Sequence, residues 1–198
     1  MSDSVSIVSD EVLYAGRLLD LVSRTLEVRK GNDSFCYSIE VARRPPGVRL
    51  IVYRDREYLL LREYRSELSR WDFRLGGGKI FETQAEHLKF ISECGNLIER
   101  AKESVVIEAR EELGVEVNSA SFIRKSCAGA TIEWDLYFFQ IDTFTTLSSG
   151  PQPEHTELLS AEWHSPESII EMIKNGAFSE DRSIGVIMQH MLNRRILP

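Results

Sequence analysis

The central part of the chain carries apolar residues at helical spacing. Apolar side chains recur at the positions of a core-facing stripe, at Val105, Val106, Ala109 and Leu113. This spacing predicts a helix with one buried face. Glu108, Glu111 and Glu112 stand at i, i+3 and i+4 on that helix, so their carboxylates share the adjoining face. Gly114 follows where helices commonly end in a left-handed cap.

Strand-like alternation of apolar and polar residues occurs on both sides of that helix. Residues 5–43 alternate in this way and predict a small antiparallel arm. A Pro-Pro-Gly segment at 45–47 predicts a boundary, so we expect an arm at 1–45 and a main domain at 46–198. Further strands are predicted at 48–53, 58–64, 71–75, 115–124, 132–141 and 158–164, a loop at 142–153, and helices at 166–176 and 181–194. Interleaved strands and helices predict an α/β fold, a mixed sheet covered by helices.

Composition and charge exclude several classes of protein. The 198 residues suffice for one well-buried domain, and a net charge of −7 argues against a broad nucleic-acid or anionic-membrane surface. No apolar run reaches the ~18–20 residues that span a bilayer, and no signal peptide is visible at the first residues. The three cysteines, Cys36, Cys94 and Cys127, have neither CxxC nor zinc-ligand spacing. We therefore expect a cytoplasmic protein with reduced thiols that binds neither nucleic acid nor membrane.

The three acids of the central helix indicate a metal site. Like charges one helical turn apart repel by a few tenths of a kcal/mol, and a divalent cation held between them reverses the sign of that interaction. Oxygen-only ligands suit Mg²⁺ or Mn²⁺. A solvated acidic face is the alternative that this run of residues leaves open.

The same residues resemble the signature of the Nudix hydrolase family, G-x5-E-x7-R-E-U-x-E-E-x-G-U, where U is a bulky aliphatic residue. The positions that fall on it in register are Glu99, Glu108, Glu111, Glu112, Gly114 and Val115. Upstream, residues 74–80 contain three consecutive glycines and resemble the strand and loop where the family's first glycine lies.

The chain departs from this signature in three places. Ile107 replaces the family arginine, and the small Ala109 takes a bulky aliphatic position. Gly78 and Glu99 are 21 positions apart where the signature has 6, so we expect an inserted amphipathic helix at about 82–98. Because Ile107 donates no hydrogen bond, the acidic cluster lacks a local cation, and its metal-free carboxylates should have raised pKa values.

Segments outside the signature resemble the ADP-ribose pyrophosphatase branch of the family. They are residues 44–48, 61–65 and 129–133, together with an acidic loop at 154–157. The resemblance implies a Nudix-type α/β/α sandwich with a mixed sheet and an N-terminal antiparallel β arm. It also implies a homodimer in which the arm contributes to the partner's site. Arg74 stands where this branch usually has glutamate, and we hypothesise that it supplies the cation that Ile107 does not.

The resemblance implies metal-dependent cleavage of a pyrophosphate bond. Its metal ligands would be Glu108, Glu111 and Glu112 with the backbone carbonyl near Gly77, and Gly78 would lie against the substrate. Glu111 and Glu112 would act directly in catalysis, with Mg²⁺ as the cofactor and Mn²⁺ as its alternative. The implied substrate is ADP-ribose or a related nucleoside diphosphate sugar, split into a nucleoside monophosphate and a sugar phosphate.

The sequence leaves the general base open. The acidic loop offers three candidates, Glu154, His155 and Glu157. Each could accept a proton from water once substrate is bound, and a solvated loop is the alternative. Glu133 is predicted as a substrate contact. Arg62 and Arg65 could pair with phosphate through their planar guanidinium groups, or they could be exposed strand residues.

Two other functions stay open. A non-catalytic Nudix-fold sensor would hold a nucleotide in the same pocket, and Ile107 and the interrupted signature favour it. A hydrolase of free nucleoside triphosphates is a weaker alternative, because small enzymes of that kind usually lack an N-terminal arm. The presence of all three glutamates of the signature favours the metal-dependent hydrolase.

Overall fold

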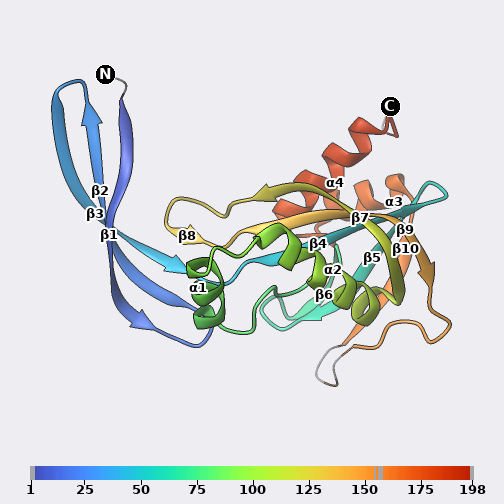
Figure 1. Ribbon diagram of the computed structural model, residues 1–198. Coiled ribbons are helices and arrows are strands. Elements are labelled where there is room, and N and C mark those ends of the chain that lie inside the picture. The colour runs from blue at the N-terminus through green and yellow to red at the C-terminus, as the bar shows by residue number, and fades with distance from the viewer. Residues whose placement is uncertain (1–2, 154, 156–157, 197–198) are drawn as a thin grey trace. The chain divides into compact units, whose positions relative to one another are not determined.

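The computed structural model describes residues 3–153, 155 and 158–196 and is shown in Figure 1. The chain forms two compact units. The first contains residues 3–46, 81–95 and 127–135, and the second contains 47–80, 96–126 and the described residues from 136 onwards. Each unit has its own sheet.

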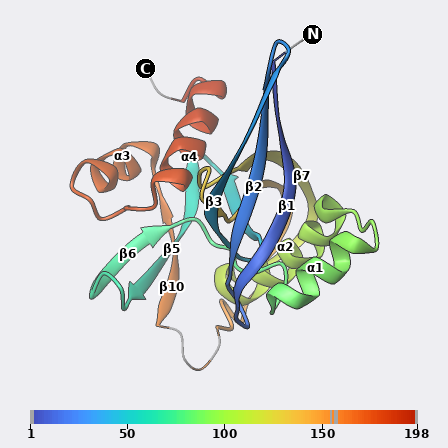
Figure 2. The ribbon, with the colours of Figure 1, turned by 90° about the vertical axis from the view of Figure 1, so that its left-hand side faces the viewer.

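The first unit is a four-stranded sheet with a short helix. Its strands are β1 (Ser4–Ala15), β2 (Asp20–Lys30), β3 (Asp33–Arg43) and β8 (Ile132–Glu133), and its helix is α1 (Gln84–Ser92). β1, β2 and β3 are antiparallel neighbours and lie side by side as one twisted ribbon in Figure 2. β8 joins β3 in parallel. The predicted N-terminal antiparallel arm is thereby confirmed.

Helix α1 lies within the predicted insertion at 82–98. Thr83 caps it, because its hydroxyl accepts a hydrogen bond from the Glu86 N–H at 3.1 Å while the Glu86 carboxylate accepts one from the Thr83 N–H at 3.2 Å. The inserted helix is thus present. It ends before the next helix begins at Leu97, whose N-cap is Asn96.

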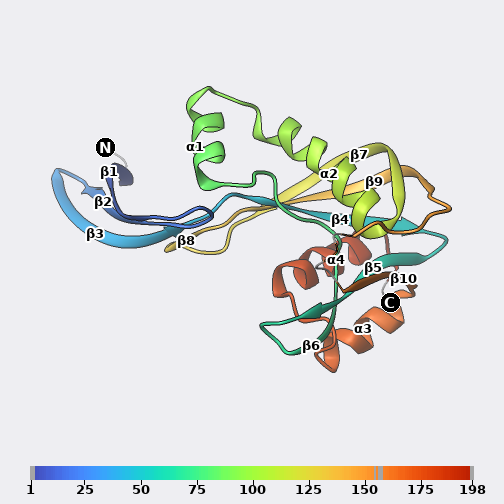
Figure 3. The same cartoon turned by 90° about the horizontal axis from the view of Figure 1, so that it is seen from below.

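The second unit is a mixed sheet with helices on both faces. Its strands are β4 (Gly47–Arg54), β5 (Glu57–Arg65), β6 (Arg70–Arg74), β7 (Val115–Ser126), β9 (Leu136–Thr146) and β10 (Leu159–His164). Their order is β10-β5-β4-β9-β7, with β6 paired to β5, and β4 and β9 are parallel. Figure 3 shows α2 (Leu97–Leu113) on one face and α3 (Pro166–Lys174) and α4 (Asp181–Asn193) on the other. The predicted α/β/α sandwich is confirmed.

The core of this unit lies around β4 and beneath α2. Fully buried residues of β4 are Val48, Leu50, Ile51 and Val52, as expected for a central strand covered on both faces. On α2, Val105, Ala109 and Leu113 are buried as predicted, whereas Val106 is exposed. The adjacent Ile107 is 51% exposed, so it does not belong to the core stripe.

Two predicted boundaries are wrong. The strand predicted at 132–141 is divided into β8 and β9, and the loop predicted at 142–153 begins later because β9 continues to Thr146. That extension pairs with β7, where the Ser119 and Thr143 hydroxyls hydrogen-bond across the strands at 2.7 Å. Cross-strand pairs of this kind stabilise a sheet, and one strand read alone does not reveal them. Among the residues that the structure describes, no helix is both long and apolar enough to cross a membrane.

A buried histidine anchors α4 to the sheet. His190 Nδ1 lies 2.8 Å from the Tyr58 hydroxyl, and Arg194 Nε donates to His190 Nε2 at 3.0 Å. Nε2 also lies 3.0 Å from Gln140 Oε1, so the ring is held between Tyr58, α4 and β9. Burial, and then the charge of Arg194, lower the pKa of His190 to about 4.

This histidine should make the protein less stable in acid. The pKa of His190 is below the unfolded value of 6.5. Between pH 6.5 and 4, the unfolded chain therefore binds a proton at this residue that the folded chain does not bind. Stability from this residue is therefore present above pH 6.5 and is lost as the pH falls towards 4, by about 3 kcal/mol. We expect His190→Gln to remove this part of the pH dependence of urea unfolding. Identical pH slopes for the variant and the unaltered protein would contradict the assignment.

Candidate functional site

The three consecutive glycines run along the edge of the central strand. β5 pairs with β4 only at Val52–Arg54, so the first half of β4 has a free edge on that side. There the Leu50 N–H donates to the Gly76 carbonyl and the Val48 N–H donates to the Gly78 carbonyl, both at 2.9 Å. The glycine loop, residues 76–78, is thereby fixed to β4 like a short additional strand.

At two positions of this loop a side chain would collide with a neighbour. Gly77 has a φ of +139°, and a Cβ there would collide with the Val48 carbonyl of β4. A Cβ on Gly78 would collide with the carboxylate of Glu108. The loop therefore passes directly against Glu108, one of the predicted metal ligands, and the roles predicted for Gly77 and Gly78 stay predictions.

Glu112 is a buried carboxylate that binds the same loop. It is 9% exposed, and its Oε2 accepts a hydrogen bond from the Gly77 N–H at 2.6 Å. Burial raises the pKa of Glu112 to about 8, against the lowering effect of the Gly77 N–H. Among charged neighbours, Glu108 raises this pKa further, and Arg49 lowers it. Without a cation the Glu112 carboxyl is therefore largely protonated at neutral pH, and a bound cation would favour its ionised form.

The three glutamates of α2 do not all face the glycine loop. Glu108 and Glu112 lie at the glycine loop, whereas Glu111 is exposed on the next face of the helix. Within the described part of the chain, no three His, Cys, Asp or Glu side chains are grouped closely enough to hold a metal ion. The donors gathered at the loop are two carboxylates and backbone oxygen, and this chemistry fits a hard divalent cation. The role predicted for Glu111 stays a prediction.

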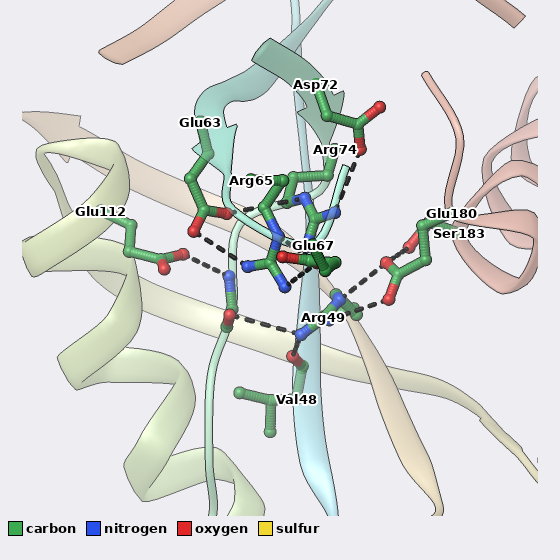
Figure 4. A network of polar contacts seen from close by, with 11 residues as sticks. Val48, Arg49, Glu63, Arg65, Glu67, Asp72, Arg74, Glu112, Glu180 and Ser183 are labelled. Atoms are coloured by element: carbon green, nitrogen blue, oxygen red, sulfur yellow. Dashed lines mark hydrogen bonds and ion pairs between the residues drawn. The ribbon is translucent and has the colours of Figure 1, made fainter. Parts of the chain in front are cut away.

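A second charged cluster lies on the β5–β6 hairpin next to Glu112, as Figure 4 shows. Glu63 raises the pKa of Glu112 through its charge and accepts a hydrogen bond from Arg65 Nη1 at 2.9 Å. Arg65 also donates to Glu67 at 2.7 Å. Arg65, predicted to bind phosphate, is thus on the same face of the sheet as Glu112 and is already paired with two carboxylates.

Arg74, our sequence-based candidate for a relocated cation, is bound elsewhere in this cluster. Its Nη2 lies 3.0 Å from the buried Asp72, and its Nε lies 3.6 Å from Glu63. Arg74 thus offsets the negative charges of Asp72 and Glu63 on the hairpin. Its link to the acids of α2 runs through Glu63, whose charge acts on Glu112.

Among the other predicted residues of the second unit, Arg62 does not share a face of β5 with Glu63. Arg62 alternates with Glu63 along β5 and therefore points to the opposite face, where its guanidinium lies 4.6 Å from the Trp71 ring centroid. Glu133 belongs to the first unit, where it pairs with Arg24. His155 is exposed. The other candidate bases, Glu154 and Glu157, lie outside the described residues, so the identity of the base stays a prediction.

Sequence analysis missed two residues at this site, Arg49 and Glu180. Arg49 is 8% exposed on β4 and binds Glu180, the residue before α4, through two hydrogen bonds of 2.9 Å. A signal was present for Arg49, because a single charge within the apolar run 48–53 is rarely buried without a partner. No sequence pattern identified Glu180, 131 positions away, as that partner.

Comparison with solved structures supports the fold. The chain is similar to a protein described as an ADP compounds hydrolase, with a TM-score of 0.67 and 17% sequence identity over 96% of this chain and 95% of that one. At this identity the likeness establishes a Nudix-like α/β fold. A scan against protein-family models finds no match. A search of curated protein sequences finds none either.

Proposed function

We propose that this protein is a Mg²⁺- or Mn²⁺-dependent hydrolase of ADP-ribose or a related nucleoside diphosphate sugar. It would release a nucleoside monophosphate and a sugar phosphate. The observation that carries the proposal is the buried Glu112 carboxylate, held by the Gly77 N–H beside Glu108. It lies in a fold shared with a hydrolase of ADP compounds.

The residues at the loop have separate roles in this reaction. Glu108 and Glu112 would hold the cation, with the Gly77 carbonyl beside them, and Glu111 would complete the set from the exposed flank of α2. When bound, the ion supplies positive charge to the phosphate oxygens and acidifies a water molecule. Gly78 has no side chain, so the pyrophosphate can approach the backbone closely.

Hydrolysis breaks one P–O bond of the pyrophosphate and forms another to water. The bridging oxygen leaves with one phosphate, and the proton of the attacking water passes to a base. Glu154, His155 and Glu157 are the candidates for that base, and a loop position allows them to approach only when substrate is bound. Arg65 would contact phosphate after exchanging one of its two carboxylate partners. The substrate contacts predicted for Arg62 and Glu133 stay predictions.

A non-catalytic nucleotide sensor is the second candidate. It is favoured by the exposed Glu111, by Ile107, and by the absence of a group of three metal-binding side chains among the described residues. A nucleoside triphosphate hydrolase is a third, weaker candidate. All three would use the same glycine loop, so only a functional assay separates them.

The assay is product release from a substrate panel in the presence of Mg²⁺ or Mn²⁺. The panel contains ADP-ribose, other nucleoside diphosphate sugars, dinucleotides and nucleoside triphosphates. Turnover of the diphosphate sugars that is abolished by EDTA would support the proposal. If every compound stays intact while ADP-ribose binds in calorimetry, the sensor is correct and the hydrolase proposal is wrong.

The arm exposes an apolar face that a second copy of the chain could cover. Strand register places Val5 and Phe35 on either side of Val28, and Ile7 and Tyr37 on either side of Leu26. The four outer side chains are 49–62% exposed. Contiguous exposed apolar patches of this kind mark interaction sites, and β1 is an edge strand. We therefore propose a homodimer formed through the arm, in a cytoplasmic protein.

A charge placed on this face should separate the dimer. We expect Ile7→Lys combined with Phe35→Lys to shift the sedimentation coefficient from dimer to monomer, because two desolvated ammonium groups would lie in the interface. Ser6→Lys is the matched control, since Ser6 lies on the opposite face of the same strand. A monomer in the unaltered protein, or a dimer that persists in the double variant, would contradict the proposed interface.

A further inference from the structure

Arg49 connects three segments of the second unit. Its guanidinium forms a two-bond ion pair with Glu180 at 2.9 Å for both bonds. Its remaining nitrogen, Nη1, donates to the Val48 carbonyl at 3.0 Å and to the Gly77 carbonyl at 3.3 Å. Four N–H groups of one buried side chain are therefore directed at β4, at the glycine loop and at the start of α4, as Figure 4 shows for the labelled residues.

The Glu180 side chain binds Arg49 and does not cap its own helix. It is the N-cap residue of α4, but its side chain makes no capping hydrogen bond to the helix backbone. Its carboxylate instead accepts hydrogen bonds from Arg49 and from the Ser183 hydroxyl. Burial opposes ionisation of Glu180, but the Arg49 hydrogen bonds and charge prevail and lower its pKa to about 2. The pair is therefore charged on both sides across the neutral pH range.

Gly77 is held by side chains at both of its backbone polar groups. Arg49 binds its carbonyl, and Glu112 accepts its N–H. A glycine has a wide choice of backbone angles, so its orientation depends on such contacts. A continuous chain of polar contacts thus runs from Glu180 through Arg49 and Gly77 to Glu112.

We infer that Arg49, oriented by Glu180, is a positioning residue that fixes the Gly77 peptide groups and through them the Glu112 carboxylate. The part of this inference that concerns cation binding rests on the proposed function. The part that concerns the Gly77 backbone does not. A salt bridge that only stabilised the fold would have no reason to control the glycine loop, and this difference can be tested.

The test replaces both partners, in Arg49→Met combined with Glu180→Met. Removing both charges leaves no unpaired buried ion, so the fold should be retained. Contacts that orient metal ligands typically contribute 10–100-fold in affinity, and we expect a loss of that size in Mn²⁺ binding measured by electron paramagnetic resonance. Hydrogen exchange at the Gly77 amide, followed by NMR, should become at least about tenfold faster, because its orientation is no longer fixed.

Two further variants keep the test decisive. Arg49→Lys retains the charge opposite Glu180 but lacks the planar fork, so we expect the Gly77 amide to lose protection even if the double variant fails to fold. Arg124→Met is the matched control. Arg124 binds Gln189 of α4 at 3.0 Å and has no hydrogen bond to the glycine loop, so its removal should change neither readout.

The outcomes separate this inference from the proposed function. Unchanged Gly77 protection in Arg49→Lys and in the folded double variant would overturn the inference, whatever the enzyme does. If the unaltered protein binds no Mn²⁺ and hydrolyses nothing, the proposed function fails. Faster Gly77 exchange in these variants, with exchange unchanged in Arg124→Met, would still support the positioning role.

Discussion

Glu112→Gln should abolish metal-dependent hydrolysis and leave the protein folded. Glutamine has the same shape and can still accept the Gly77 N–H, which Glu112 binds at 2.6 Å. It brings no charge to the cation, so we expect kcat/KM to fall by at least about 10³-fold, or roughly 4 kcal/mol in activation free energy. The measurement is AMP release from ADP-ribose with Mg²⁺.

The same variant should be more stable than the unaltered protein when metal is removed. The folded-state pKa of Glu112 is raised to about 8 from 4.5, so the folded state holds a proton that the unfolded chain has lost. Stability from this group is present below pH 4.5 and is lost as the pH rises towards 8. In EDTA, the melting temperature of Glu112→Gln should therefore exceed that of the unaltered protein at pH 8 and approach it at pH 5.

Glu103→Gln is the control, because Glu103 lies on the same helix in an exposed pair with Arg100. Such pairs contribute little to stability, and this one is not at the glycine loop. Two results would contradict the assignment of Glu112: hydrolysis that survives Glu112→Gln, or equal losses in both variants.

The glycine loop should respond very differently to alanine at two adjacent positions. At Gly77 a Cβ would meet the backbone carbonyl of Val48, and φ is +139°. Neither the strand nor the angle can adjust cheaply, so we expect Gly77→Ala to cost more than about 3 kcal/mol in free energy of unfolding. Urea unfolding measures that cost.

At Gly78 the Cβ would instead meet the end of the Glu108 side chain, which can rotate away. We expect Gly78→Ala to fold with a loss of only about 1 kcal/mol. Its activity should fall about 10²-fold, because a displaced ligand misplaces the reacting groups by roughly 1 Å. Gly185→Ala is the control, since no atom lies within 4 Å of a Cβ there and the residue lies within α4. It should be stabilising by up to about 1 kcal/mol. A Gly78→Ala enzyme with full activity would show that Glu108 is not a ligand.

Sequence patterns predicted the helix and the loop that form this site, but they did not predict which of its side chains are buried. The helix that carries Glu108 and Glu112, its end at Gly114, and the glycine loop before it are all present in the structure. The pattern placed three glutamates on one face, but residues 111 and 112 differ by about 100° around a helix. The direction of the sheet decides which of them is buried, and that direction is a property of the tertiary fold. Val106 is exposed beside the buried Val105 for the same reason.

Contacts between distant segments were beyond prediction from the sequence. The resemblance pointed to Arg74 as the cation that replaces the family arginine, because Arg74 stands where the branch usually has glutamate. Arg49 acts on the site more directly than Arg74, because it lowers the pKa of Glu112 and binds the Gly77 carbonyl. Its partner Glu180 immediately precedes α4, which packs on the opposite face of the sheet from α2. Pairing of this kind depends on which helix covers which face, and local residue spacing carries no such information.

The most direct test of the proposed hydrolase activity is a ³¹P NMR time course of ADP-ribose with the unaltered protein and Mg²⁺. We expect the two pyrophosphate resonances to be replaced by those of AMP and ribose 5-phosphate. Conversion should stop on addition of EDTA and should not occur with Glu112→Gln. Unchanged pyrophosphate resonances, under conditions in which ADP-ribose is shown to bind, would contradict hydrolysis and leave the protein as a nucleotide sensor.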